Sequence, residues 1–277
     1  MKKWLGFFTF TKRHASKFIN SSFDMKSILK YILRNGLRDR LYLGLLITLI
    51  VSFSISIFLG STMLVEQQHS TAAYITGSSR AILAIGMILF VCLTVSRAFE
   101  NKEVEFILSK SISREQFILG YLAGFFLSAF IIFLPLVITI AIVTKPTFFG
   151  LAIWSASLLA ELLIVICFAL LASMILKNSF SAIMASFAFY IMSRLMGMFV
   201  MAIDLPEDFV AAKNHILSAS LKILSAVFPR LDLFSQSSWL GYGIKDFESL
   251  KIIAIQSLIY IPLMIFMSFH DFKRKQF

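Results

Sequence analysis

The stretch SRAFENKEVEFILSKSISREQFILG, residues 96–120, interrupts a sequence that is strongly apolar on both sides of it. The chain has 277 residues, of which 58% are hydrophobic, and 30 are phenylalanines. Only 15% of its residues are charged, whereas soluble domains average about 25%. This composition favours an integral membrane protein, in which residues 96–120 form a charged break between two spans.

Six apolar runs have about the length that a helix needs to cross a bilayer, roughly 20 residues. The sequence therefore predicts an all-α polytopic membrane protein with one transmembrane domain over residues 1–277. The predicted spans are Leu41–Leu64, Ala81–Val95 with an extension through Ser78–Arg80, Phe117–Val143, Phe148–Leu176, Phe180–Ile203 and Ile252–Phe269. The polar sequence EQQHSTAAYITGSSR, residues 66–80, is predicted as the break between the first two spans.

The distribution of lysine and arginine predicts the orientation of the spans. Of the 26 Lys and Arg residues, 18 fall on one side, seven on the other, and Arg194 lies within a span. The richer side consists of residues 1–40, 96–116, 177–179 and 270–277. We expect this side to be cytoplasmic, with both termini inside, a basic tail at 270–277 and an external segment at 204–251.

The segment DMKSILKYILRNGLRDR, residues 24–40, precedes the first span. Its apolar residues recur at helical spacing on one face, whereas Lys26, Lys30, Arg34 and Arg38 fall elsewhere. A helix with an apolar stripe and a basic polar face is suited to the headgroup layer of a membrane. We expect an interfacial amphipathic helix here; the alternative is an ordinary solvated helix.

Residues 97–112 are predicted to form a short two-faced helix. One face gathers Val104, Ile107, Leu108 and Ile112. Phe99 and Phe106 fall on the other face, among charged residues. Exposed aromatic rings surrounded by charges are typical of docking surfaces.

Ser113 and Gln116 form a capping-box pattern just before the third apolar run. We expect this cap to start the third span, so that tight turns connect the short helix to the second and third spans. A helix held in this way moves only together with both spans, as a mechanical coupler requires. The alternative is that residues 96–116 are an ordinary charged loop.

The longer stretch SRAFENKEVEFILSKSISREQFILGYLAGF, residues 96–125, resembles the cytoplasmic loop of the type-2 permease family of ATP-binding-cassette exporters. The positions that carry the resemblance are Glu103, Glu105, Phe106, Ile107, Leu108, Ser113, Arg114, Phe117 and Gly120. VFPRLDLF at 227–234 resembles the family's segment before the last span, and FHDFKRKQF at 269–277 its basic tail. The chain departs from the family at Lys110 and Ser111, where many members have a proline near the turn.

The resemblance implies a bacterial plasma-membrane permease that pairs with a second copy of itself within the membrane lipid, most simply as a homodimer. It also implies two cytoplasmic ATPase subunits that use ATP and magnesium, and outward transport. The chain contains no Gly-x-x-x-x-Gly-Lys-Ser/Thr phosphate loop, so the ATPase is expected on a separate polypeptide. The expected ATPase contacts are Phe99, Glu100, Lys102, Glu103, Phe106 and Arg114.

Glu161 and Arg194 lie near the middle of consecutive predicted spans, where charged groups are costly. We expect them to form a buried ion pair that joins two helices; the alternative is a polar point on a substrate path. The four histidines are scattered and no metal-ligand or catalytic pattern is present, so neither an enzyme nor a bound cofactor is expected. No nucleic-acid partner is expected either.

Two other functions fit a chain of this kind. A secondary transporter that works without ATP predicts two matching halves with broken helices near the midplane, and the sequence shows no such symmetry. A membrane anchor or scaffold for a larger complex needs no polar residues in the middle of its spans. The presence of Glu161 and Arg194 there counts against this function.

Overall fold

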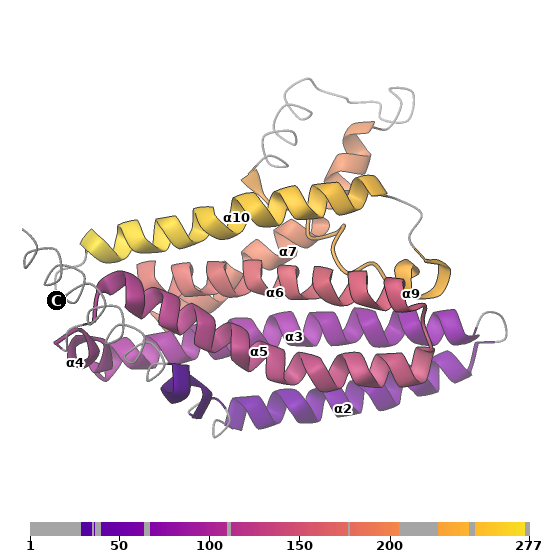
Figure 1. The fold of residues 1–277 in the computed structure, drawn as a ribbon, viewed down its shortest axis with the longest axis horizontal. Helices are drawn as coiled ribbons and strands as arrows, with labels where there is room; N and C mark the ends of the chain where they lie inside the picture. Colours follow the sequence, from indigo (N-terminus) through magenta and orange to yellow (C-terminus); the bar gives the residue numbers. More distant parts are fainter. Residues whose placement is uncertain are drawn as a thin grey trace, which may run out of the picture.

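The computed structural model describes residues 29–34, 36, 40–63, 67–109, 112–176, 178–204, 227–243 and 247–274. Within these residues the protein consists of helices without strands (Figure 1). The helices are α2 (Arg40–Ser61), α3 (Gln67–Glu100), α4 (Glu103–Ser109), α5 (Arg114–Thr144), α6 (Phe148–Ile175), α7 (Ser179–Asp204), α9 (Ser238–Tyr242) and α10 (Phe247–Arg274). Six of the described helices are long and apolar enough to cross a membrane, which confirms the six-span prediction.

Helices α3 and α6 form the centre of the bundle. Both bury most of their apolar stretch, whereas α2, α5, α7 and α10 bury a third or less of theirs. Figure 1 shows α10 along one side and α2 along the opposite side, with α6 and α3 between them. The outer helices turn their remaining apolar side chains outward, as expected where lipid replaces water around the bundle.

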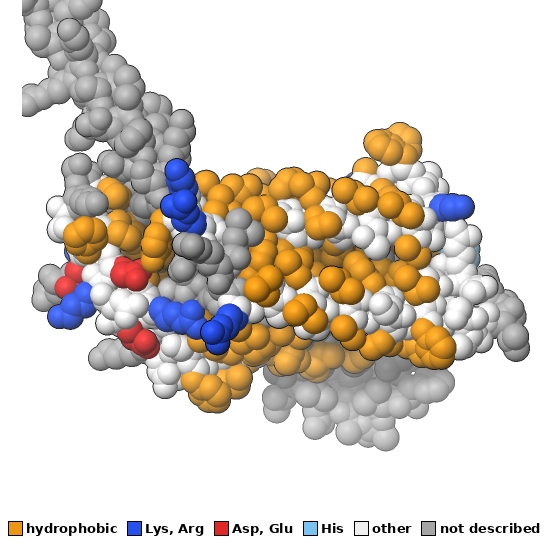
Figure 2. Space-filling view, turned by 90° about the horizontal axis from the view of Figure 1, so that it is seen from below, with side chains coloured by type: hydrophobic (Ala, Val, Ile, Leu, Met, Phe, Trp, Pro, Cys, Tyr) orange, Lys and Arg blue, Asp and Glu red, His pale blue; other side chains and the backbone are white. Residues whose placement is uncertain are grey.

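On the face that Figure 2 shows, apolar side chains cover the middle of the bundle, and charged side chains gather toward one end. One end carries α4 and the C-terminal turn of α10, and we call it the α4 end. The other end carries α9 and the connection between α5 and α6, and we call it the α9 end. A broad apolar surface along the length of the helices is the distribution that a bilayer requires of a spanning protein.

The prediction of a break at residues 66–80 is wrong from Gln67 onward, because α3 begins there and continues to Glu100. A helix of 34 residues is about 51 Å long, which exceeds the hydrocarbon core of a bilayer. The polar first turns are held by side-chain contacts. Gln68 donates to the carbonyl of Thr144 at 2.8 Å, and the ring of His69 stacks on that of Tyr242 in α9.

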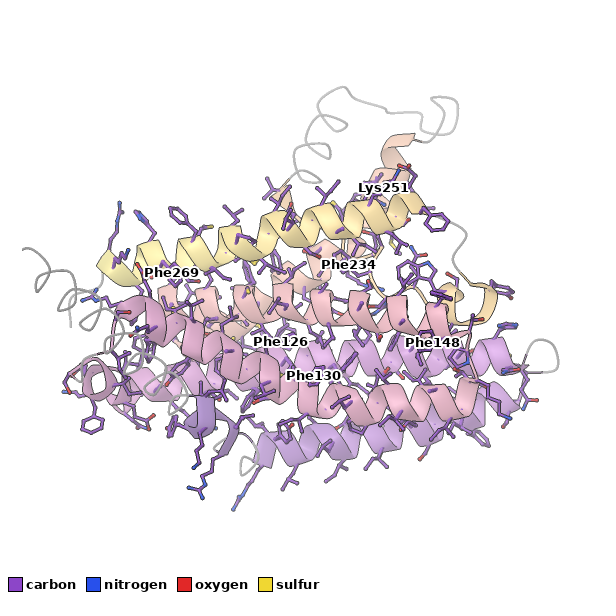
Figure 3. The ribbon with its side chains drawn as sticks, viewed as in Figure 1. Phe126, Phe130, Phe148, Phe234, Lys251 and Phe269 are labelled. Carbon is purple, nitrogen blue, oxygen red and sulfur yellow. The ribbon has the colours of Figure 1, made fainter. Side chains whose placement is uncertain are left out.

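Residues 229–237 form an irregular loop packed among the helices. Leu231 and Phe234 are fully buried, and Phe234 lies beside α6 in Figure 3. The loop contacts Glu161, the central residue of α6. Irregular backbone at such a depth requires partners within the protein for its polar groups. The predicted external segment 204–251 includes this loop and α9, and its residues 205–226 and 244–246 lie outside the described ones.

The predicted interfacial helix 24–40 is described in part. Residues 29–34 are helical, and Ile32 is fully buried. A Cβ on Gly124 of α5 would lie 2.8 Å from the Cδ1 atom of Ile32, so these two elements pack closely. This short helix is therefore anchored to α5 through Ile32, while residues 24–28, 35 and 37–39 lie outside the described part.

Candidate functional site

A short turn separates α4 from α3, and residues 110–113 separate it from α5. Helix α3 ends at Glu100, and Lys102 takes a left-handed backbone with φ of 56°, which stops the helix. Helix α4 then runs from Glu103 to Ser109. The predicted single helix over 97–112 is thus two helices with a turn between them.

The cap predicted at the start of the third span is confirmed. The amide of Gln116 donates to the hydroxyl of Ser113 at 3.2 Å, and the amide of Ser113 donates to Oε1 of Gln116 at 3.0 Å. These bonds satisfy two of the amide groups that a helix start otherwise leaves without partners. Helix α5 therefore begins at Arg114, directly after the short connection from α4.

The two phenylalanines predicted to share one face occupy different environments. Phe106, on α4, is 64% exposed. Phe99, on the last turn of α3, packs against the core, with its ring centroid 6.5 Å from that of Phe272 in α10. The prediction of a common polar face is wrong because the chain turns between them. Val104 and Ile107 do face the core, as predicted.

Arg114 joins the start of α5 to the end of α10. Its guanidinium donates to the carbonyls of Phe272 at 2.7 Å and Lys273 at 3.0 Å, and it lies over the Phe272 ring. The last carbonyls of a helix have no hydrogen-bond partner within that helix, and an arginine from a neighbouring helix can donate to them. The ammonium of Lys273 pairs with Glu115 at 2.7 Å on the same two helices.

The remaining predicted contacts are Glu100, Lys102 and Glu103. Glu100 and Lys102 are exposed at the turn between α3 and α4. Glu103 is half-buried and accepts a hydrogen bond of 2.7 Å from the hydroxyl of Tyr31. Burial, assisted by this bond and by the charge of Glu103, raises the pKa of Tyr31 to about 12. Glu103 thus connects α4 to the helical residues 29–34.

Glu161 and Arg194 lie together in the interior, as the sequence led us to expect. The Arg194 guanidinium is 3.9 Å from Oε1 of Glu161, whose side chain is fully buried. Oε2 of Glu161 accepts a hydrogen bond from Ser235 at 3.1 Å. Arg194 also donates to the carbonyl of Leu231. The pair therefore fixes the loop 229–237 against α6 and α7.

Arg80 is a third member of this cluster, which was not predicted from the sequence. Its guanidinium donates to the carbonyls of Phe234 at 3.3 Å and Ser235 at 3.1 Å. The prediction of a break at 66–80 placed Arg80 at the edge of a span, whereas it lies near the middle of α3. Its position directly before an uninterrupted apolar run was the available signal.

The polar backbone of Ser235 is also satisfied by α6. The Trp154 indole donates to its carbonyl at 3.2 Å, and its amide donates to the Ser157 hydroxyl at 3.0 Å. Ser235 has a left-handed backbone with φ of 52°. This unusual conformation is held by bonds to α3 and α6, which indicates a well-defined position for the loop.

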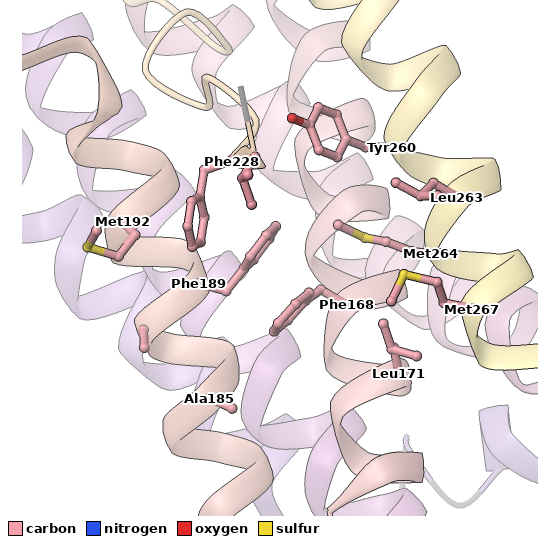
Figure 4. Close-up of a pocket in the computed structure, with 12 residues that line it drawn as sticks. Phe168, Leu171, Ala185, Phe189, Met192, Phe228, Tyr260, Leu263, Met264 and Met267 are labelled. Carbon is pink, nitrogen blue, oxygen red and sulfur yellow. The ribbon is translucent and has the colours of Figure 1, made fainter. Parts of the chain in front are cut away.

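An apolar groove of about 410 Å³ opens between α7 and α10, with α6 as its floor (Figure 4). Phe168 of α6 and Phe189 of α7 stack there with centroids 3.9 Å apart. The other lining residues are Leu171, Ala185, Ala188, Met192, Val227, Phe228, Tyr260, Leu263, Met264 and Met267. Neither Glu161 nor Arg194 lines this groove.

Within the described residues, no group of three or more His, Cys, Asp or Glu side chains is placed to hold a metal ion. Cys92 and Cys167 are buried and unpaired with each other. No known family model matches the sequence, and no curated protein matches it either.

Proposed function

We propose that this chain is the transmembrane permease subunit of an ATP-binding-cassette transporter, and that it moves its substrate outward. The energy comes from ATP hydrolysis by a separate ATPase subunit, which docks at α4 on the cytoplasmic side. Two permease copies and two ATPase subunits make up the working assembly. The exposed, short helix α4 between two long spans is the observation that carries this proposal.

The way α4 is attached supports a coupling role. The turn at residues 101–102 joins it to α3, the longest described helix. The capped start at Ser113 joins it to α5. Val104 anchors it in the core with 1% of its surface exposed. A push on α4 is therefore expected to move both spans.

The exposed side of α4 has the character of a docking surface. Phe106 is 64% exposed, and Glu105 and Lys102 are exposed near it in sequence. A large ring surrounded by charged groups is typical of the residues that dominate protein–protein binding. Phe99, in contrast, supports the proposal only indirectly, because it packs α3 against the end of α10.

The test is co-purification with a candidate ATPase, followed by measurement of its ATP hydrolysis. We expect Phe106→Ala to weaken binding by more than tenfold, as hot-spot aromatics do, and to reduce stimulation of the ATPase. Phe148→Ala is the matched control, because Phe148 is 77% exposed at the α9 end (Figure 3). This variant should bind and stimulate as the unmodified chain does.

Unchanged binding and stimulation with Phe106→Ala would remove α4 as the docking site. An equal loss in both variants would indicate a general effect on the protein rather than a docking contact. Failure to retain any ATPase that carries a phosphate loop would argue against the transport function itself.

A further inference from the structure

A polar pocket of about 210 Å³ lies at the α4 end, apart from the exposed side of α4. It is bounded by the helical residues 29–34 and by α3, α4 and α5. Its lining consists of Tyr31, Thr94, Arg97, Ala98, Asn101, Glu103 and Tyr121. This pocket has space for several water molecules or for a small polar group.

The hydroxyl of Tyr121 indicates that the pocket receives a polar occupant. Tyr121 is 1% exposed, and its hydroxyl has no hydrogen-bond partner within the described part of the chain. A buried hydroxyl without a partner is destabilising, and native proteins rarely leave one in that state. An occupant that donates to or accepts from this oxygen would remove the penalty.

The charges that line the pocket specify a zwitterion. Arg97 provides a planar guanidinium, which suits phosphate oxygens. Glu103 provides a carboxylate, of which one oxygen, Oε2, already accepts from Tyr31 at 2.7 Å. Its second oxygen retains the capacity to accept from an ammonium group. One cationic and one anionic side chain in the same small pocket favour an occupant that carries both charges.

We propose that this pocket binds a phosphoethanolamine group, with the phosphate at Arg97 and Asn101 and the ammonium at Glu103. A primary ammonium donates hydrogen bonds to Glu103 and to the hydroxyl of Tyr121. The quaternary ammonium of phosphocholine has no N–H group to donate. The group arrives either as the headgroup of a lipid or as a free small molecule. The pocket is lined by residues at the end of α3, at the start of α4 and near the start of α5. The ends of spanning helices lie at the level of lipid headgroups.

Occupancy of this pocket would connect elements that are otherwise joined at few points. Arg97 and Asn101 lie at the end of α3 and in the turn after it, Glu103 starts α4, and Tyr31 belongs to the helical residues before α2. A bound phosphoethanolamine group would thus hold the α4 end together. This inference does not require the transport function, because binding is measured on the permease chain alone.

The experiment uses the purified full chain in nanodiscs that contain equal parts of phosphatidylethanolamine, phosphatidylcholine and phosphatidylglycerol. Native mass spectrometry after release from the nanodisc measures which lipid stays bound. We expect preferential retention of phosphatidylethanolamine. Tyr121→Phe should reduce this preference by roughly three- to tenfold, the effect of one hydrogen bond. Arg97→Gln should reduce the retention of all three lipids by more than about tenfold, because the phosphate that Arg97 binds is common to them and its charged partner is lost.

Two variants serve as matched controls. Tyr74→Phe removes a hydroxyl from the exposed surface of α3, and Glu105→Gln removes a charge from the exposed side of α4. Neither residue lines the pocket, so both variants should keep the preference for phosphatidylethanolamine. Tyr121→Phe retains the shape of the ring, so it tests the proposal even if Arg97→Gln fails to fold.

Free phosphoethanolamine, added to the released protein, distinguishes the two sources of the group. Displacement of the lipid by millimolar phosphoethanolamine would show that the headgroup alone is recognised. Retention of the lipid would show that the acyl chains contribute. Equal retention of all three lipids, or an unchanged preference with Tyr121→Phe, would overturn the proposal.

Discussion

The carboxyl group of Glu161 is the most constrained ionisable group in the described interior. It is fully buried, lies 3.9 Å from the Arg194 guanidinium and accepts a hydrogen bond from Ser235. Arg80 reaches the same loop from α3. Two guanidinium groups therefore depend on one carboxylate for compensation of their charge. Removing one member of a buried cluster of charges costs far more stability than replacing all of its members by apolar residues.

Glu161→Gln should lower the free energy of unfolding by about 3 kcal/mol, the lower end of the cost for a buried pair, because it leaves the partly buried guanidinium groups of Arg80 and Arg194 without a carboxylate. Thermal unfolding of the detergent-purified protein measures the effect. Glu248→Gln is the control, since Glu248 is an exposed partner of Lys251 on the surface of α10 and should change little. If the two variants unfold at the same temperature, the cluster does not stabilise the bundle.

A double variant measures the interaction between Glu161 and Arg194 apart from the rest of the cluster. The double change Glu161→Gln with Arg194→Gln should cost less than the two single changes added together, because the second change removes a charge that the first left unpaired. Strictly additive effects would show that the two side chains do not interact. Ser235→Ala should be milder than either, because it removes one neutral donor.

On the alkaline side, the contact between Tyr31 and Glu103 should respond above the pH at which an ordinary tyrosine loses its proton. The pKa of Tyr31 is raised from 10.0 to about 12, first by burial and then by Glu103. A raised pKa means that the folded chain holds the proton more tightly than the unfolded chain. The stabilisation is therefore complete below pH 10 and is lost as the pH rises toward 12.

Absorbance titration of tyrosinate, compared between the unmodified chain and Tyr31→Phe, measures this pKa. The difference in tyrosinate absorbance between the two proteins should rise near pH 12. Glu103→Gln should move this rise to lower pH. Tyr31 itself should stay protonated between pH 6 and pH 9. A difference curve centred near pH 10 would mean that Tyr31 is exposed to solvent and not bonded to Glu103.

Helix packing is tightest where glycines let backbones approach. A Cβ on Gly150 of α6 would lie 2.3 Å from the carbonyl oxygen of Trp239 in α9, which is backbone and cannot move alone. A Cβ on Gly86 of α3 would meet the Cδ1 atom of Leu45, the flexible end of a side chain. Gly77 of α3 has open space around it.

These three glycines should respond differently to alanine. Gly150→Ala should destabilise the protein by about 1–3 kcal/mol, because α9 must shift. Gly77→Ala should stabilise it by up to about 1 kcal/mol, since alanine is the better helix former. Gly86→Ala should fall between them. Thermal unfolding ranks the variants, and a stabilised Gly150→Ala would contradict the close contact between α6 and α9.

The cap of α5 should be worth about 1 kcal/mol, as expected for the loss of a serine N-cap. Ser113→Ala removes the acceptor of the Gln116 amide. Ser155→Ala is the control, because the Ser155 hydroxyl bonds only within the exposed surface of α6. The two variants are compared by thermal unfolding. Equal stability would show that α5 starts equally well without its capping box.

The sequence predicted the elements whose signals are local. Each apolar run became a helix, and the cap at Ser113 follows from residues within four positions of each other. Elements that depend on distant partners were missed. The first turns of α3 are polar, and their contacts to Thr144 and Tyr242 become visible only once the helices are assembled.

The same difference between local and distant signals explains which residues of the candidate site could be predicted from the sequence. The approach of Glu161 and Arg194 was predictable because they occupy similar depths on consecutive spans. Arg80 and Ser235 join them through the buried loop 229–237, which no local pattern indicates. The turn at Lys102, which separates Phe99 from Phe106, has a left-handed backbone at a residue type that rarely adopts one.

The bundle as a whole has two unlike ends, and their separation follows from the helix connections. Helices α3 and α5 meet at α4, and the C-terminal turn of α10 is fixed there by Arg114. The α9 end contains the connection between α5 and α6 and the start of α10. Because the six long helices alternate in direction, one membrane must place α4 and α9 on opposite sides.

Single introduced cysteines test this arrangement. Glu105→Cys on α4 and Tyr242→Cys on α9 both replace exposed residues. The natural Cys92 and Cys167 are buried and should react slowly, and a variant with both changed to alanine controls for them. In intact cells, a membrane-impermeant maleimide should label Tyr242→Cys and leave Glu105→Cys unlabelled. After the membrane is opened, both should be labelled. Labelling of Glu105→Cys in intact cells would place α4 outside, where no cytoplasmic ATPase can reach it, and labelling of both from outside would contradict the six-span bundle.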